Sequence, residues 1–159
     1  MTDRTQNRAN RILVVDDEEA IRKITVSMLV AANFECREAA SGLETLALFK
    51  SGEQFDLLLA DLMMPEMNGI ALLERTKDKY PDMPVVIVTA VHDVQVVLQA
   101  MRSGAYDCLM KPFEREQLPT VRRALEDRRL KLEHRAYVSN LEAQVATLTK
   151  QLKSSRNKR

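Results

Sequence analysis

Tryptophan is absent from this 159-residue sequence, and only two cysteines are present. Cys36 and Cys108 lie inside apolar segments and lack the spacing of a disulfide framework or a zinc site, so we interpret them as buried thiols. The missing tryptophan and the lack of a hydroxyl-rich phosphate loop argue against a flavin-binding domain. No stretch approaches the roughly 18 consecutive apolar residues of a membrane helix, and the N-terminus lacks the apolar core of a signal peptide. We therefore expect a cytoplasmic protein with no membrane partner.

Charge is distributed unevenly along the chain. Residues 1–112 contain 12 basic and 17 acidic residues, a net charge of −5, whereas residues 113–159 contain 12 basic and 6 acidic residues, a net charge of +6. A basic segment can bind nucleic acid or a membrane surface, but scattered Lys and Arg on a helix usually form a solvated face. We adopt the second interpretation and expect no nucleic-acid partner.

Five short apolar runs rich in Val, Ile and Leu alternate with segments of helical periodicity. The runs occupy residues 12–15, 34–39, 57–60, 85–88 and 106–110. Strands that alternate with helices predict crossover connections and a parallel sheet. Because the two central runs are apolar throughout, we expect helices to cover both of their faces. The sequence therefore predicts an α/β fold with a doubly wound, five-stranded parallel sheet.

The four intervening segments have apolar residues at helical spacing, which predicts one apolar stripe per helix facing the sheet. Gly52 and Gly104 follow two of these segments, where a left-handed cap is expected. The predicted stripes are Ile21, Ile24, Met28 and Leu29; Leu43, Leu46 and Ala47; Ile70, Leu73 and Thr76; and Val94, Val97, Leu98 and Met101.

After Phe113 the sequence has no further strand pattern, and charged or helix-favouring residues predominate. We expect an extended C-terminal helix, with Pro119 tolerated in its first turn. The chain is divided into a flexible N-terminal segment (1–10), a globular domain (11–127) and a helical, coiled-coil extension with a basic tail (128–159). Apolar residues of the extension follow the 3-4-3-4 spacing of a parallel two-stranded coiled coil, which predicts a homodimer; a lone helix is the alternative. These residues are Val138, Leu141, Val145, Leu148 and Leu152.

Polar residues follow the predicted strands at the points where these strands end. Asp16 and Asp17 follow the first strand, Asp61 the third, Thr89 the fourth and Lys111 the fifth. Taken singly, each could cap a helix, begin a turn or be solvated. Together they should meet at one edge of a parallel sheet, where three carboxylates repel one another unless a cation or a proton neutralises them. A hard divalent ion has the required preference for oxygen ligands, so the sequence predicts a site for Mg²⁺ and a phosphoryl group.

Several motifs, in this order and spacing, resemble the receiver domain of response regulators in two-component signalling. The motifs are VVDDE at 14–18, DLMMPEMNG at 61–69, TA at 89–90, GA at 104–105 and KPF at 111–113, and the resemblance extends from about residue 11 to residue 125. It implies a flavodoxin-like fold with strand order 2-1-3-4-5. It also implies a signalling domain that is not an enzyme, although it promotes its own phosphorylation and dephosphorylation, and that accepts a phosphoryl group from a histidine kinase or a phosphotransfer protein.

The resemblance implies a role for each of the strand-end residues. Asp61 would be the phosphoacceptor, because its carboxylate would attack the phosphoryl donor. Lys111 and Thr89 would each bind a phosphoryl oxygen, Lys111 with its ammonium group and Thr89 with its hydroxyl. Mg²⁺ would be held directly by Asp17, Asp61 and the main-chain carbonyl of Met63, and through a water molecule by Asp16.

A conformational switch is also implied, in which Thr89 moves toward the phosphoryl group. The bond before Pro112 is expected to be cis and to aim the lysine inward. The family usually has an aromatic residue three positions before the lysine, and this sequence has Cys108 there. Tyr106 precedes Cys108 by two residues, so a regular strand would place both on one face, where Tyr106 could supply part of the aromatic role.

An aspartate-nucleophile phosphohydrolase of the haloacid-dehalogenase type is the alternative function, since it also combines Mg²⁺ with a strand-end aspartate in a doubly wound fold. Such an enzyme needs a second carboxylate two residues after the nucleophile as a general acid, and this position is Met63. The output of the receiver is open: the chain is either a stand-alone receiver or part of a longer regulator, and the sequence names no effector.

Overall fold

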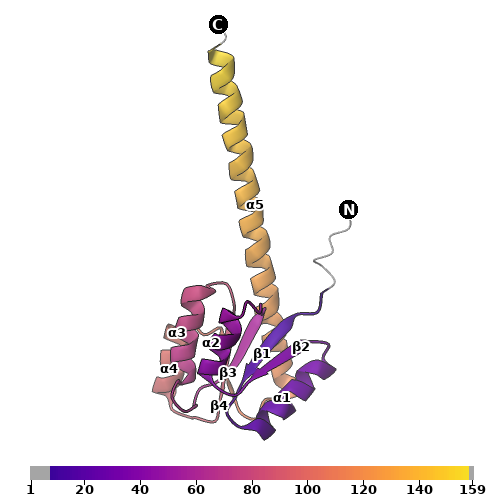
Figure 1. The fold of residues 1–159 in the computed structure, drawn as a ribbon, viewed down its shortest axis with the longest axis vertical. Helices are drawn as coiled ribbons and strands as arrows, with labels where there is room; N and C mark the ends of the chain where they lie inside the picture. Colours follow the sequence, from indigo (N-terminus) through magenta and orange to yellow (C-terminus); the bar gives the residue numbers. More distant parts are fainter. Residues whose placement is uncertain (1–7, 158–159) are drawn as a thin grey trace.

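The structure is a computed structural model in which residues 8–157 are described. Five strands form one parallel sheet in the order β2-β1-β3-β4-β5 (Figure 1). They are β1 (Arg11–Val15), β2 (Glu35–Ala39), β3 (Leu57–Asp61), β4 (Val85–Thr89) and β5 (Asp107–Met110). The predicted fold and strand order are confirmed, and each predicted strand differs from the observed one by a single residue at one end.

β3 and β4 lie inside the sheet, and all of their residues are buried. Their sequences, LLLAD and VVIVT, are apolar up to the last residue because both faces of these strands are covered. The edge strands differ, since β2 has exposed residues at alternate positions and β5 has no fully buried residue. On β3 and β4, polar side chains therefore occur only at the C-terminal positions, Asp61 and Thr89.

Helices cover the sheet in two layers (Figure 1). α2 (Gly42–Lys50), α3 (Gly69–Lys79) and α4 (Val94–Arg102) cover one face, whereas α1 (Glu19–Ala31) and the beginning of α5 (Leu118–Arg156) cover the other. Alternate strand residues contribute to the two cores: Leu58 and Ala60 pack on the side of α2, α3 and α4, and Leu57 and Leu59 on the side of α1 and α5. This arrangement leaves the C-terminal ends of all five parallel strands at one edge.

The predicted apolar stripe is confirmed on α3, where Ile70, Leu73 and Thr76 are all buried. On the other helices the prediction is partly wrong, because these predicted residues are exposed: Ile24, Leu43, Ala47, Val94, Leu98 and Met101. Residues of an adjacent stripe are buried instead: Thr25 on α1, Thr45 and Phe49 on α2, and Ala100 on α4. Helical periodicity alone cannot choose between two neighbouring stripes, because the choice depends on which side chain fits the space above the sheet.

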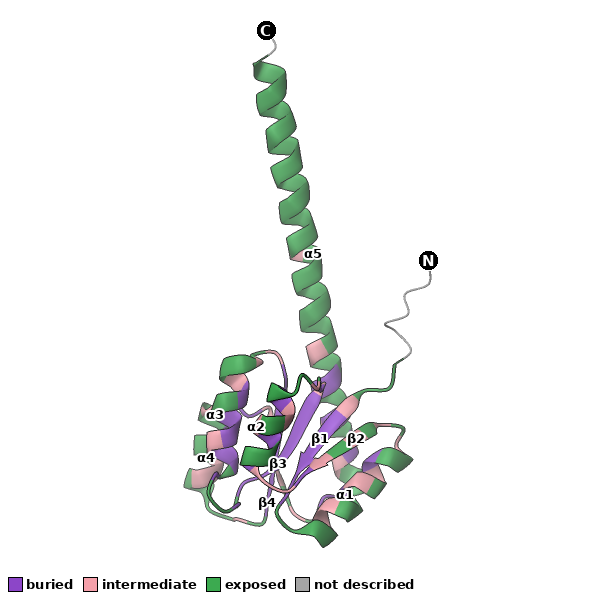
Figure 2. Cartoon of the chain, viewed as in Figure 1, coloured by how far each residue is buried: buried purple, intermediate pink, exposed green. Residues whose placement is uncertain are grey.

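α5 is 39 residues long, and most of it projects beyond the sheet and is exposed (Figures 1 and 2). A 3₁₀ turn at Arg115–Gln117 precedes it, and Pro119 lies in its first turn, as predicted. Its buried residues all occur near its start: Leu118, Val121, Ala124 and Leu125. Within residues 8–157, no helix has both the length and the apolar character needed to cross a membrane.

Two ion pairs connect α5 to the body beyond its last buried residue. Arg128 pairs with Asp56 at 3.0 Å, and Arg135 pairs with Asp82. The division predicted between residues 127 and 128 therefore falls inside a continuous helix that still contacts the body on its C-terminal side. Residues 1–7 and 158–159 lie outside the described part of the chain, so the flexible segment at 1–10 and the end of the basic tail stay predictions.

Candidate functional site

The polar residues predicted from the strand ends meet at one edge of the sheet. The register of β1 with β3 places Asp16 next to Asp61, the last residue of β3. The register of β4 with β5 pairs Thr89 with the residue that precedes Lys111. The sheet topology thus brings together residues that are up to 95 positions apart, counted from Asp16 to Lys111 in the sequence.

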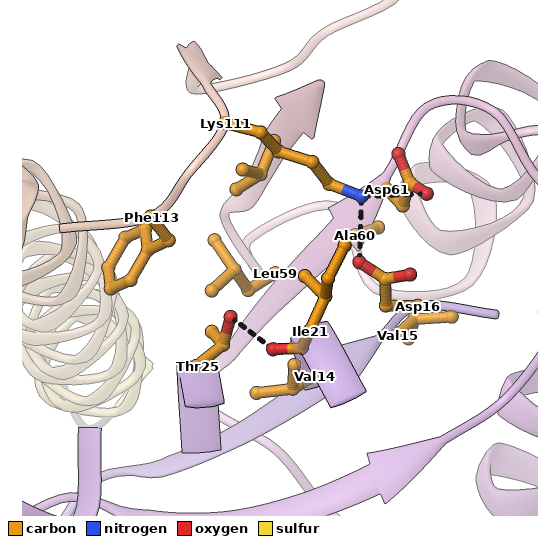
Figure 3. Close-up of a pocket in the computed structure, with 11 residues that line it drawn as sticks. Val14, Val15, Asp16, Ile21, Thr25, Leu59, Ala60, Asp61, Lys111 and Phe113 are labelled. Carbon is orange, nitrogen blue, oxygen red and sulfur yellow. Dashed lines mark hydrogen bonds and ion pairs between the residues drawn. The ribbon is translucent and has the colours of Figure 1, made fainter. Parts of the chain in front are cut away.

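Lys111 bridges two buried carboxylates at this edge (Figure 3). Its Nζ lies 2.9 Å from Oδ2 of Asp16 and 3.1 Å from Oδ2 of Asp61, and each carboxylate residue is 5% exposed. The backbone N–H of Lys111 donates to the carbonyl oxygen of Thr89 at 2.9 Å, and the bond from Lys111 to Pro112 is cis, as predicted. The lysine is therefore fixed to β4 through its main chain and to β1 and β3 through its side chain.

Burial and the ion pairs of Lys111 have opposing effects on the pKa values of this cluster. Burial raises the pKa of Asp61 above its ordinary value; the hydrogen bond and charge of Lys111 oppose this rise, and the charge of Asp16 adds to it. Burial would lower the pKa of Lys111, but its hydrogen bonds to Asp16 and Asp61, together with the charges of these two carboxylates, outweigh burial and raise the pKa. These directions indicate that Lys111 remains charged and neutralises only part of the negative charge around it.

Three carboxylates of the site can ligate one cation. One oxygen each from Asp16, Asp17 and Asp61 lies within 4.8 Å of the others, and Asp17 is exposed to solvent. The backbone N–H of Met63 donates to Oδ1 of Asp61 at 3.3 Å, so the Met63 main chain lies at the site although its side chain is exposed. Carboxylate oxygens suit a hard divalent ion, which would also neutralise the remaining negative charge. The residues present therefore fit a divalent cation.

The protein interior behind this cluster is nearly filled. A cavity of about 20 Å³ lies next to Lys111 and the two buried carboxylates, and it is walled mainly by apolar residues of α1, β1 and β3 (Figure 3). This volume admits about one water molecule. A phosphoryl donor must therefore approach from the solvent side, where Asp17 and Met63 are exposed.

Thr89 is fully buried at the end of β4, and its hydroxyl accepts a hydrogen bond of 3.0 Å from the N–H of Val91. Among residues 8–157, no hydrogen bond joins this hydroxyl to Asp61 or Lys111. A hydroxyl that accepts one bond still has its own proton to donate. Thr89 is thus brought to the site, and its donor remains available for another acceptor.

The predicted position of Tyr106 is wrong. Cys108 packs on the side of α2, α3 and α4, whereas Tyr106 packs on the opposite side, with the residues under α1 and α5. β5 begins at Asp107, so Tyr106 precedes the strand and the two-residue alternation does not apply to it. The Tyr106 hydroxyl donates a 2.6 Å hydrogen bond to Asp127, and burial together with this bond raises its pKa to about 12. Tyr106 therefore does not share a face with Cys108.

Both cysteines are free and half-buried, so the prediction of buried thiols is only partly right. Burial raises the pKa of the Cys36 thiol to about 11, and the charge of Glu38 adds to this effect. Burial also raises the pKa of the Cys108 thiol above its ordinary value. Both residues are therefore protonated and weakly reactive near neutral pH.

Sequence reasoning missed two features that support the site. Arg22 of α1 donates from Nη1 to the carbonyl oxygen of Asp16 at 2.7 Å and from Nε to Oε1 of Glu38 at 3.0 Å. Gly69, the first residue of α3, packs so closely that a Cβ there would lie 2.5 Å from the carbonyl oxygen of Asp61. The available signals were a basic residue five positions after an aspartate pair and a glycine at a loop-to-helix junction. Neither signal identifies the partner atom.

Comparison with known proteins identifies relatives of the whole globular part. A family model described as the response regulator receiver domain matches residues 12–123. The chain is 37% identical over 127 residues to the regulatory protein AtoC of Escherichia coli, a match that covers 79% of this chain and 27% of that protein. It is 39% identical over 115 residues to the DNA-binding transcriptional regulator NtrC of Salmonella typhimurium, with 72% and 24% covered. The chain thus spans about a quarter of the length of these curated relatives.

Solved structures give the same result. A CheY-like response regulator receiver domain protein from Methanospirillum hungatei superposes with a TM-score of 0.73 at 31% identity, covering 78% of this chain and 99% of that one. NtrX from Brucella abortus superposes with a TM-score of 0.74 at 35% identity, covering 84% of this chain and 30% of that one. The similarity therefore extends to a protein of receiver size and to part of a longer regulator.

Proposed function

The chain belongs to the family of response-regulator receiver domains, and from this premise we propose that it accepts a phosphoryl group on Asp61 from a histidine kinase or a phosphotransfer protein. The observation that carries the proposal is the position of Asp61 on β3, between β1 and β4. It is the carboxylate with Asp16 and Asp17 on one side and Lys111 and Thr89 on the other. A phosphoryl group on Asp61 would therefore be surrounded by every polar group of the site.

In the proposed reaction a carboxylate oxygen of Asp61 forms a bond to phosphorus while the bond between phosphorus and the donor imidazole nitrogen breaks, and the electron pair of that bond leaves with the imidazole. Lys111, now shared between two carboxylates, would bind a phosphoryl oxygen as a point charge. The hydroxyl of Thr89 would donate a hydrogen bond to another phosphoryl oxygen. The same groups would stabilise the phosphoryl charge when a water molecule attacks phosphorus and the bond to the Asp61 oxygen breaks, which releases inorganic phosphate and the free carboxylate. We therefore include in the proposal that the domain promotes its own phosphorylation and dephosphorylation.

Mg²⁺ is the cation that we propose for the acidic cluster. Asp17, Asp61 and the main-chain carbonyl of Met63 would hold it directly, and Asp16 would do so through a water molecule. When bound, the ion supplies charge neutralisation for the carboxylates and the phosphoryl oxygens. The grouping of three carboxylates and the raised pKa of Asp61 support this assignment.

Intact-mass analysis tests the phosphoacceptor. A small phosphodonor or its beryllofluoride mimic, supplied with Mg²⁺, should modify the wild-type chain once and leave Asp61→Asn unmodified. Asp78→Asn, which changes an exposed acidic residue of α3 in the same way, is the matched control and should be modified like the wild type. Full modification of Asp61→Asn would refute the assignment.

The phosphohydrolase alternative has no support. It requires a general acid two residues after the nucleophile, and the side chain at that position is the exposed thioether of Met63. The family match is to receivers.

We also propose that α5 forms a parallel homodimer. Beyond the body, Val145, Leu148 and Leu152 are more than half exposed, and Leu141 is 41% exposed. With Val138 they follow the spacing that places valine at a and leucine at d of a two-stranded coiled coil. Association would remove these side chains from water, which a lone helix of about 58 Å, at 1.5 Å per residue, cannot do.

Sedimentation of the full chain at tens of micromolar tests the dimer. The wild type should sediment as a dimer, and the double variant Leu141→Gln with Leu148→Gln as a monomer. The control replaces Ala143 and Lys150, which lie on the side of α5 opposite the seam, with Gln and should remain dimeric. A version that ends at Asp127 should be monomeric. A monomeric wild type would contradict the proposal.

The expectation that this chain binds no nucleic acid stays a prediction. NtrC is named as DNA-binding, and this chain spans about a quarter of that protein. Part of the basic charge on α5 is already paired within the helix, since Arg129 contacts both Glu126 and Glu133. This pairing supports the interpretation of α5 as a solvated helix face.

A further inference from the structure

Arg22 contacts the main chain between the two aspartates that follow β1. Its Nη1 donates to the carbonyl oxygen of Asp16 at 2.7 Å, and its side chain is only 12% exposed. The N–H of Asp16 donates to the carbonyl oxygen of Ala39 at 3.2 Å. Both peptide groups that flank Asp16 are therefore fixed, one by the end of β2 and the other by Arg22.

Glu38 holds the guanidinium group in this position. Its Oε1 accepts a 3.0 Å hydrogen bond from Nε of Arg22, and its Oε2 accepts a 2.7 Å bond from Nζ of Lys23. These bonds, chiefly the one from Lys23, lower the pKa of Glu38, so its carboxylate stays ionised near neutral pH. Glu38 lies on β2, paired with Val14 of β1, so Arg22 connects the edge strand to the end of β1.

We propose that Arg22 is a positioning residue for the cation: by holding the Asp16 carbonyl it fixes the peptide that carries Asp17, and it thereby sets the affinity of the site for Mg²⁺. This inference rests on the proposed function of the acidic cluster. Asp17 is exposed, so its carboxylate is positioned mainly by the main chain to which it is attached. The planar guanidinium donates from two nitrogens in a fixed geometry, Nη1 to Asp16 and Nε to Glu38, whereas a lysine has one nitrogen at the end of a flexible stem.

A purely electrostatic role and a positioning role of Arg22 predict opposite changes in the affinity for Mg²⁺ when Arg22 is replaced. Removing a positive charge near three carboxylates would, by electrostatics alone, strengthen Mg²⁺ binding. Removing a residue that orients a ligand typically weakens metal affinity by about 10- to 100-fold. Arg22→Met should therefore bind Mg²⁺ at least about tenfold more weakly than the wild type. Lys23→Met is the matched control, because it removes the same charge and another partner of Glu38 without removing a contact to Asp16.

The experiment is a Mg²⁺ titration of the full chain without any phosphodonor. Binding is measured from the NMR chemical shifts of the backbone amides at the site. Lys23→Met should bind Mg²⁺ as tightly as the wild type or slightly more tightly. Arg22→Lys keeps the charge but loses one of the two contacts, so its affinity should be several-fold below that of the wild type. Thermal denaturation without Mg²⁺ checks that each variant is folded. If Arg22→Met does not fold, Arg22→Lys decides, and wild-type affinity in that variant overturns the proposal.

The outcomes separate this inference from the function on which it rests. Wild-type or tighter Mg²⁺ binding by Arg22→Met would overturn the positioning role, and so would equal weakening in Lys23→Met. Beryllofluoride modification of the wild type is measured in parallel. A wild type that binds Mg²⁺ but is not modified refutes the phosphoacceptor and leaves the role of Arg22 standing, whereas a wild type that binds no Mg²⁺ refutes both.

Discussion

Gly69→Ala should damage both the stability of the domain and the reactivity of Asp61. The N–H of Gly69 donates to the carbonyl oxygen of Leu62 at 2.8 Å, which holds the start of α3 against the end of β3. A Cβ at position 69 would lie 2.5 Å from the carbonyl oxygen of Asp61 and 2.9 Å from Cα of Leu62. Both atoms belong to the backbone, so no side-chain rotation relieves the contact. Either α3 or the strand end that carries Asp61 must move.

The expected magnitudes follow from this contact. Overpacking at a site that cannot relax costs about 1–3 kcal/mol. For a chain of this length each kcal/mol lowers the melting temperature by about 2–4 °C, so the variant should melt roughly 2–12 °C below the wild type. Misplacement of a reacting group by about 1 Å can cost on the order of 100-fold in rate. Phosphorylation by a small phosphodonor should therefore slow by about 10- to 100-fold.

Gly52→Ala is the control, because it introduces the same methyl group away from the site. Gly52 has a φ of +89°, and a Cβ there would meet nothing within 4 Å. Its cost is backbone strain of about 1–2 kcal/mol, so circular dichroism should record a similar fall in melting temperature. Mass spectrometry should record a wild-type phosphorylation rate. Wild-type stability and rate in Gly69→Ala, or equal slowing in both variants, would refute the reasoning.

Three further predictions concern the cation, the conformational switch and the loss of stability at alkaline pH. Asp17→Ala should abolish the Mg²⁺ dependence of phosphorylation, because two carboxylates hold a strongly hydrated ion poorly; an unchanged Mg²⁺ titration would count against the ligand role. Hydrogen exchange should respond to beryllofluoride in Cys108→Ala but not in Thr89→Ala, because only the hydroxyl can bind the phosphoryl group, and the reverse pattern would contradict the proposed switch. Since Tyr106 has a pKa raised to about 12, its contribution to stability is complete below pH 10 and is lost as the pH rises through 12. Tyr106→Phe should therefore flatten the decline in melting temperature over this range, and an identical decline would show that another group titrates.

The sheet could be predicted from the sequence because a strand covered on both faces has few alternatives. The runs at β3 and β4 are apolar until their last residue, and this pattern with intervening helices is typical of a parallel sheet. The buried face of each helix was harder to predict, because a helix is covered on one side only. On α4 the larger residues Val94, Leu98 and Met101 are exposed while Ala100 is buried. Residue size and apolarity favour the larger stripe, whereas the space between helix and sheet accepts the smaller one.

From the residues alone, the site could be predicted to the level of which strand ends meet; the cis bond before Pro112 was predicted from the family resemblance. Parallel strands align their C-terminal ends whatever their sequence separation, so Asp16, Asp61, Thr89 and Lys111 follow from the topology alone. Which atom each side chain contacts depends on local geometry that the topology does not determine. Lys111 divides its ammonium between two carboxylates, and the Thr89 hydroxyl accepts from its own loop. Both arrangements are choices among several acceptors and donors within reach, and only three-dimensional packing selects one.

Tyr106 illustrates the same limit at the edge of the sheet. Alternation along a strand assigns residues to faces only where the strand is regular, and β5 is a four-residue edge strand that begins after Tyr106. The tyrosine is instead directed by its hydroxyl, which reaches Asp127 on α5, 21 positions further along the chain. The tyrosine is partly exposed and lies before the regular strand, where the two-residue rule does not apply, so its bond to Asp127 is compatible with the side opposite Cys108. Cys108 occupies the position at which the family usually has an aromatic residue, and Tyr106 packs on the opposite side of the sheet. We therefore expect a switch in this chain to depend on Thr89 and on the packing around a small thiol rather than on the rotation of a ring.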